Sequence, residues 1–134
     1  MSGAGTTERA VPLVLLVDDS PLVTDALTVL LEATGHRVRV ADSVRSAVDA
    51  ARAERPDVML LDLTLPDGDG LAVLDQLRAD DAAPRTAVAL TGHDDPGTRE
   101  RCVAAGCVDV ITKPLSTADL LRRMRGWTAG ERAG

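Results

Sequence analysis

Five short strand-like runs, each followed by a segment with helical periodicity, constrain the fold of this chain more than any other feature of its sequence. The runs lie at residues 13–17, 36–41, 58–61, 87–90 and 108–112. Strands that alternate with helices in this way build a parallel sheet with helices on both faces, connected by right-handed crossovers. The run at 36–41 alternates apolar and polar residues, so we expect it at an edge of the sheet. The sequence therefore predicts one α/β domain.

Residues typical of helix ends bracket the five helical segments. In chain order, the predicted helices run from Pro21 to Gly35, from Ser43 to Pro56, from Leu71 to Leu77, from Pro96 to Gly106, and from Ser116 or Thr117 to Gly126. We predict a flexible tail at residues 1–11, the domain at 12–126 and a second tail at 127–134, because neither end of the chain continues the pattern.

Composition limits the classes of function that this chain can have. Its 134 residues suit a single domain, and a formal net charge of −6 argues against nonspecific binding to nucleic acid. The chain has no apolar run long enough to cross a membrane and no visible signal peptide, so we expect a cytoplasmic protein with no membrane partner. Trp127 is the only aromatic residue, and Leu, Val and Ala must therefore fill the core.

Polar side chains stand at the carboxyl ends of four of the predicted strands. Asp18 and Asp19 end the first strand, Asp62 ends the third, Thr91 the fourth and Lys113 the fifth. In open parallel sheets, ligands bind at this edge, where the direction of winding reverses. We therefore expect these five side chains to converge on one cleft.

Three carboxylates in one cleft need a positive partner. Two unit charges about 5 Å apart repel by roughly 3 kcal/mol at an effective dielectric constant of about 20. Either a cation neutralises the cluster or one carboxylate stays protonated. A site made of few oxygen ligands suits Mg²⁺, which keeps several waters and accepts a phosphate oxygen.

A carboxylate beside Mg²⁺, a lysine and a hydroxyl is an arrangement for phosphoryl transfer. Asp62 would be the nucleophile and would form an acyl phosphate. Lys113 would neutralise charge on the transferred group, and the Thr91 hydroxyl would bond one of its oxygens. The sequence therefore predicts a phosphoacceptor rather than a conventional enzyme.

These motifs, in this order and spacing, resemble the receiver domains of bacterial two-component response regulators (CheY-like domains). The resemblance covers about residues 13 to 125 and rests on Val17-Asp18-Asp19, Leu61-Asp62 followed by Pro66 and Asp69-Gly70, Leu90-Thr91-Gly92, Ala105-Gly106, and Lys113-Pro114. It implies a flavodoxin-like, doubly wound five-stranded parallel sheet in the order 2-1-3-4-5, covered by five helices.

The resemblance also implies residue roles and partners. Asp62 would accept a phosphoryl group from a sensor histidine kinase or a phosphotransfer protein. Asp19, Asp62 and the backbone carbonyl of Thr64 would bind Mg²⁺ directly, and Asp18 would act mainly through water. The Lys113–Pro114 bond is often cis in this family. A downstream protein would bind the face formed by the fourth helix, fifth strand and fifth helix.

Three positions near the predicted site concern tuning and switching. The family usually has Tyr or Phe three residues before the lysine, where this chain has Val110. A switch would then run through the loop after Thr91 and the fourth helix rather than through an aromatic rotamer. In the family, the side chains at the positions of Thr64 and His93 flank the phosphoryl group and tune its hydrolysis.

Alternative interpretations remain open at this point. Val110 favours a phosphorylation-independent binding module, a pseudo-receiver, whereas the complete acidic site opposes it. The chain has no Walker A sequence and no G-x-G-x-x-G after the first strand, which argues against a nucleotide enzyme. The spacing around Asp67 and Asp69 does not fit an EF-hand calcium loop. Cys102 and Cys107 are better explained as two buried thiols than as metal ligands.

Overall fold

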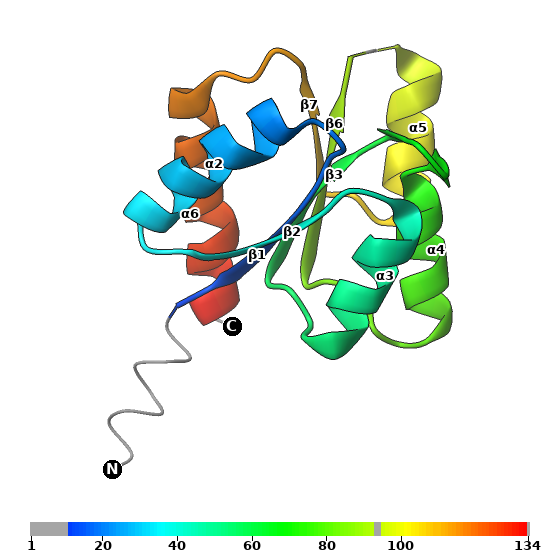
Figure 1. Ribbon diagram of the computed structural model, residues 1–134, viewed down its shortest axis with the longest axis horizontal. Coiled ribbons are helices and arrows are strands. Elements are labelled where there is room, and N and C mark those ends of the chain that lie inside the picture. The colour runs from blue at the N-terminus through cyan, green and yellow to red at the C-terminus, as the bar shows by residue number, and fades with distance from the viewer. Residues whose placement is uncertain (1–10, 93–94, 134) are drawn as a thin grey trace.

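A parallel sheet of five strands forms the centre of the molecule, as a computed structural model of the chain shows (Figure 1). The structure describes residues 11–92 and 95–133. The strands are β1 (Leu13–Val17), β2 (Arg37–Ala41), β3 (Val58–Asp62), β6 (Thr86–Thr91) and β7 (Asp109–Thr112). Their order is β2-β1-β3-β6-β7, which confirms the predicted 2-1-3-4-5 topology and places the alternating strand at an edge.

Five helices cover the two faces of this sheet, so the predicted α/β architecture is confirmed. Helices α2 (Pro21–Ala33) and α6 (Thr117–Ala133) lie on one face, and α3 (Val44–Ala53), α4 (Leu71–Ala79) and α5 (Pro96–Ala105) lie on the other (Figure 1). Successive side chains of a strand point to opposite faces, so the central strands must be apolar on both sides.

The sheet accordingly divides the core into two apolar clusters. In β1, Val14 and Leu16 pack with α2 and α6, whereas Leu15 and Val17 pack on the side of α3, α4 and α5. The same alternation runs through β3 and β6, whose buried residues are Val58, Met59, Leu60, Leu61, Ala87, Val88, Ala89 and Leu90. The continuously apolar runs in the sequence are a consequence of this two-sided burial.

Local hydrogen bonds fix the beginnings and ends of helices. Ser43 and Ser46 form a reciprocal capping box at the start of α3. Helix α5 ends at Gly106, whose φ of 105° is in the left-handed region that favours glycine. There the backbone N–H of Cys107 donates to the Cys102 carbonyl over 2.9 Å. The two cysteines are free and buried, as the sequence predicts, and burial raises the pKa of Cys107 to about 12.

The last helix is longer than the sequence predicts. The expected tail at 127–134 is helical through Ala133, and Gly126 lies within α6. A glycine inside a helix costs about 1 kcal/mol but does not end it when neighbouring residues are packed. Here Trp127 packs against the core on the α2 side, and the buried Thr128 hydroxyl donates to the Met124 carbonyl over 2.9 Å.

A small hairpin between β3 and α4 is absent from the prediction. It pairs β4 (Thr64–Leu65) with β5 (Gly68–Asp69) in antiparallel fashion, directly after Asp62. At its tip, the Asp67 carboxylate accepts the backbone N–H groups of Val44 and Arg45 over 2.7 and 3.1 Å. The hairpin is thus fastened to the beginning of α3.

Two predictions concern residues outside the described ranges. They are the flexible tail, of which only residue 11 is described, and the tuning role of His93. Across the described part of the chain, every helix is too short or too polar to cross a lipid bilayer.

Candidate functional site: an acidic cleft at the carboxyl edge of the sheet

Two neighbouring strands bring Asp18 and Asp62 together. Val17 of β1 pairs with Leu61 of β3, so the next residue of each strand is a carboxylate at the same level of the sheet. Asp18 and Asp62 are only 3% and 8% exposed, whereas Asp19 is exposed at the rim. One carboxylate oxygen from each of the three residues lies within 4.8 Å of the others. The convergence predicted from the strand ends is therefore present.

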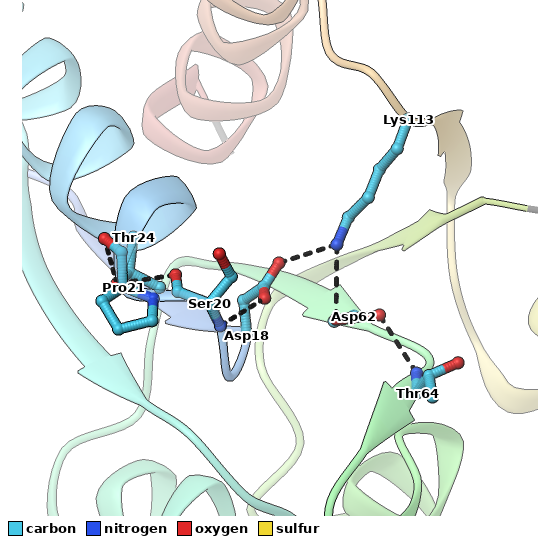
Figure 2. A network of polar contacts seen from close by, with 7 residues as sticks. All are labelled: Asp18, Ser20, Pro21, Thr24, Asp62, Thr64 and Lys113. Atoms are coloured by element: carbon cyan, nitrogen blue, oxygen red, sulfur yellow. Dashed lines mark hydrogen bonds and ion pairs between the residues drawn. The ribbon is translucent and has the colours of Figure 1, made fainter.

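Lys113 contacts both buried carboxylates. Its Nζ lies 2.8 Å from Oδ2 of Asp18 and 3.3 Å from Oδ2 of Asp62 (Figure 2). The lysine follows β7 at the far side of the cleft, and its backbone N–H donates to the Thr91 carbonyl over 2.8 Å. A single cation therefore bridges strand ends that are 95 and 51 residues away from it in the sequence.

The electrostatics of the cleft follow from this burial. Loss of solvent raises the pKa of Asp62, and the nearby charge of Asp18 adds to the increase. The Thr64 N–H and Lys113 oppose it without cancelling it. The pKa of Lys113 is also raised: burial disfavours its charge, but the hydrogen bond to Asp18 and the charges of both carboxylates outweigh that effect. The site thus places a carboxylate whose ionised form is disfavoured, Asp62, beside an amine whose protonated form is favoured, Lys113.

Backbone N–H groups fix the orientation of both carboxylates. The Ser20 N–H donates to Oδ1 of Asp18 over 2.9 Å, and the Thr64 N–H donates to Oδ1 of Asp62 over 3.0 Å (Figure 2). Each carboxylate is therefore held between a backbone donor on one oxygen and Lys113 on the other. Three carboxylates with neighbouring oxygens are the hard ligand set that Mg²⁺ prefers, so the residues present fit this ion.

Thr91 ends β6 beside the acidic cluster and is buried. It lines a cleft of about 460 Å³ between the hairpin and the beginning of α5. The other polar residues of this cleft are Thr64, Asp69, Asp95, Thr98 and Arg101. The structure thus brings the predicted hydroxyl to the same edge of the sheet as Asp62 and Lys113.

Gly70 supports the site through a close backbone approach. A Cβ atom at this position would lie 2.1 Å from the backbone oxygen of Asp62. The Gly70 N–H donates to the Leu63 carbonyl over 2.9 Å, which draws the start of α4 against the end of β3. In the sequence, Gly70 stands out only as part of the family motif Asp69-Gly70, because its contact with Asp62 forms only when the hairpin is folded.

The remaining predicted positions lie around this centre. Val110 is buried in β7, on the side of the sheet covered by α3, α4 and α5. The Lys113–Pro114 peptide bond is cis, as the family resemblance implies. The side chains of Asp18, Asp19, Asp62 and Lys113 are in one cluster, with Thr91 and Thr64 next to it.

Comparison with known protein families and proteins agrees with this geometry. The model of the response regulator receiver domain family matches residues 14–125. The transcriptional regulatory protein TrcR of Mycobacterium tuberculosis is 38% identical over 113 residues, which cover 84% of this chain and 44% of TrcR. This chain spans about half the length of the curated regulators that it matches first.

Solved structures give the same result at the level of the fold. A CheY-like receiver from Methanospirillum hungatei superposes with a TM-score of 0.83 at 24% identity, covering 92% of this chain and 99% of that chain. The receiver domain of sensor histidine kinase PA1611 from Pseudomonas aeruginosa has a TM-score of 0.79 at 32% identity, covering 89% and 98%. That structure has a magnesium ion coordinated in its active-site cleft.

Proposed function

This chain belongs to the response regulator receiver domain family, and on that premise we propose that Asp62 is its phosphoacceptor. The observation that carries the proposal is the position of Lys113, which contacts the buried carboxylates of Asp18 and Asp62 together. A cation held in this way is ready to neutralise charge on a group that arrives at Asp62. The phosphodonor would be a sensor histidine kinase or a phosphotransfer protein.

The proposed reaction moves one phosphoryl group between two side chains. An Oδ atom of Asp62 forms a bond to phosphorus, and the bond between phosphorus and the donor histidine nitrogen breaks. The electron pair of that bond stays on the imidazole. The product is an acyl phosphate on Asp62.

Mg²⁺ fits the acidic cluster and, when bound, would neutralise charge on the phosphoryl oxygens. Asp19, Asp62 and the backbone carbonyl of Thr64 would be direct ligands, and Asp18 would act mainly through water. The magnesium ion in the PA1611 receiver supports this assignment. Asp18 then has a second task, because it also holds Lys113 in the cleft.

Lys113 and Thr91 would receive the phosphoryl group. Lys113 is 29% exposed, so its amine can turn from the carboxylates to a phosphoryl oxygen without entering the core. The Thr91 hydroxyl would bond another oxygen and shift the end of β6 toward Asp62. Because Val110 stands in β7 where the family usually has Tyr or Phe, no aromatic side chain at this position can change rotamer in response to that shift. The shift of β6 would instead reach α5 through the backbone.

The proposed output is a changed protein-binding surface on α5, β7 and α6. Val103 on α5 and Val108 before β7 are both well exposed, and they supply apolar contact area on this face. We propose a downstream protein as the partner, without direct binding of this chain to nucleic acid or membrane, and a cytoplasmic location. These statements concern the receiver, which is about half the length of the related regulators.

A phosphorylation-independent binding module is the second candidate, and Val110 is the observation that favours it. Intact-mass spectrometry after incubation with Mg²⁺ and acetyl phosphate separates the two. We expect a gain of about 80 Da, the mass of one phosphoryl group, that is absent from Asp62→Asn. If neither acetyl phosphate nor a competent kinase adds this mass to magnesium-loaded protein, the phosphoacceptor proposal is wrong and the binding module remains.

A further inference from the structure

Helix α5 has the least apolar anchorage of the five helices. Cys102 is its only buried residue, whereas α3 and α4 each bury four side chains and α2 buries three. Helical stability in proteins comes mainly from the packing of an apolar face. Something other than apolar burial must therefore hold α5 against the rest of the domain.

Two arginines make polar contacts between α5 and neighbouring elements in the part of the chain that the structure describes. Arg101 of α5 forms an ion pair and hydrogen bond with Asp69, at the end of the hairpin. At the C-terminal end of the helix, Arg78 of α4 donates to the Ala105 carbonyl over 2.6 Å. Both residues of the first contact, Arg101 and Asp69, line the cleft that Thr91 and Thr64 also line.

Asp69 connects this ion pair to the phosphoacceptor. Its Oδ2 contacts Arg101, and its Oδ1 accepts the Leu71 N–H over 2.9 Å at the start of α4. Asp69 also pairs with Thr64, whose N–H holds Asp62. The next residue, Gly70, lies against the Asp62 backbone. Along these contacts, only two residues separate Arg101 from Asp62: Asp69, and then either Thr64 or Gly70.

The same cleft brings the beginning of α5 close to Thr91. The Asp95 carboxylate caps α5 by accepting the Thr98 N–H over 2.8 Å, and both residues line the cleft together with Thr91. Arg101 and Asp69 line the same cleft, so their ion pair joins α5 to the hairpin beside Thr91.

We propose that Arg101 is a positioning residue that couples α5 to the phosphoacceptor loop through Asp69. The inference rests on the proposed function and adds a regulatory contact to it. Arg101 and Asp69 are in direct contact in this structure, so a displacement of α5 from the hairpin weakens their attraction. In the proposed coupling, phosphorylation of Asp62 brings about that displacement. The pair then opposes phosphorylation, and by linkage phosphorylation loosens the pair.

The exposure of this pair suits a contact that must open. The side chains of Arg101 and Asp69 are 54% and 48% exposed, so water competes for both charges. Half-exposed ion pairs are weak, and we expect the loss of this one to change an equilibrium or rate roughly two- to five-fold. A fully buried pair would lock α5 instead.

The test compares Arg101→Gln with a matched variant, Arg52→Gln. Arg52 of α3 forms an ion pair with Asp80, whose exposures of 49% and 43% are close to those of the Arg101 pair, away from the cleft. Phosphoryl uptake is followed by intact mass in Mg²⁺ and acetyl phosphate, and amide hydrogen exchange is followed in α5 and the hairpin. We expect Arg101→Gln to take up phosphoryl groups roughly two- to five-fold faster than wild type.

Hydrogen exchange and further variants complete the expected result. Wild-type α5 exchanges faster when phosphorylated, and Arg101→Gln already exchanges faster without phosphorylation. Arg101→Lys stays near wild type because it keeps the charge. Asp69→Asn, which keeps an acceptor for the Leu71 N–H, behaves like Arg101→Gln, and the double variant adds nothing further.

The coupling is wrong if Arg101→Gln and Arg52→Gln have the same uptake rates and the same exchange in α5. It is also wrong if Arg101→Gln is slower than wild type. Failure of the proposed function is a different result, because wild type itself then gains no mass. In that case the exchange of the Gly70 N–H decides the coupling alone: it must be faster in Arg101→Gln than in Arg52→Gln.

Discussion

At the scale of single residues, one backbone contact beside Asp62 leaves no room for an added atom. Gly70 makes this contact, because its backbone occupies the space next to the Asp62 carbonyl. Its own backbone conformation is ordinary helical, with φ of −56°, so the requirement for glycine comes from proximity rather than from a special dihedral angle.

We expect Gly70→Ala to damage both stability and phosphorylation. The new methyl group would lie 2.1 Å from the Asp62 oxygen, so β3 and α4 must separate. Overpacking of this kind costs about 1–3 kcal/mol. Thermal denaturation and phosphoryl uptake by intact mass would measure the two effects.

Gly92→Ala is the matched control, since this glycine follows Thr91 and a Cβ there meets no atom within 4 Å. We expect it to denature close to the wild-type temperature. Equal losses in both variants would mean that the approach of Gly70 to Asp62 does not matter for the site.

At the scale of secondary-structure elements, the β4–β5 hairpin does more than connect β3 to α4. Its tip holds the beginning of α3 through Asp67, and its end holds α5 through Asp69. The loop that follows Asp62 is thereby tied to α3 and α5, two helices on the same face, and it leads directly into a third, α4.

The pH dependence of stability should reveal the contact of Asp67 with α3. Its hydrogen bonds from the Val44 and Arg45 N–H groups lower the pKa of the Asp67 carboxyl. A lowered pKa in the folded state gives stability that is present above the unfolded value, about 3.9, and is lost as pH falls through the folded pKa. We therefore expect Asp67→Asn to denature at a lower temperature than wild type at pH 7, with a difference that shrinks below pH 4. A difference that stays constant from pH 7 to pH 3 would contradict this assignment.

In helix α6, unlike at Gly70, replacement of a glycine by alanine should stabilise the protein. Gly126 lies inside the helix, and a Cβ at this position meets nothing within 4 Å. We expect Gly126→Ala to stabilise the protein by about 0.5–1 kcal/mol, because alanine is the better helix former. Chemical denaturation measures the change. A destabilised variant would indicate that α6 does not continue through this residue in solution.

The sequence was sufficient for the five strands of the main sheet, for the five helices, and for the convergence of Asp18, Asp19, Asp62 and Lys113 at the carboxyl edge. Strands buried on both faces leave uninterrupted apolar runs, and the polar residue that ends each run marks the carboxyl edge. The β4–β5 hairpin was missed because strands of two residues have no periodicity. The Arg101–Asp69 pair joins residues 32 apart and leaves no local pattern. The end of α6 was placed too early because the packing of Trp127 and Thr128 outweighs the weak helix propensity of Gly126.

At the scale of the whole molecule, the acidic cleft is a compromise between stability and chemistry. Burial raises the pKa of Asp62, so at pH values above the pKa of this group in the unfolded chain it lowers the free energy of unfolding. Burial of the two apolar clusters on either side of the sheet offsets this loss of stability.

We expect Mg²⁺ to stabilise the protein and Asp62→Asn to remove most of that effect. A ligand at ten times its dissociation constant adds about 1.4 kcal/mol to the free energy of unfolding. In EDTA, Asp62→Asn should instead denature at a higher temperature than wild type, because the buried charge is gone. Thermal denaturation at matched ionic strength measures both changes. An equal response of the two proteins to Mg²⁺ would place the ion elsewhere.

Trp127 packs on the face of the sheet covered by α2 and α6, whereas α5 lies on the other face. The intrinsic fluorescence of this protein therefore comes from one side of the domain only, since there is no second tryptophan and no tyrosine. Rearrangement of α5 alone would leave the emission unchanged. A change in emission on phosphorylation would show that a conformational change at the site extends to the opposite face of the sheet, where Trp127 lies in α6.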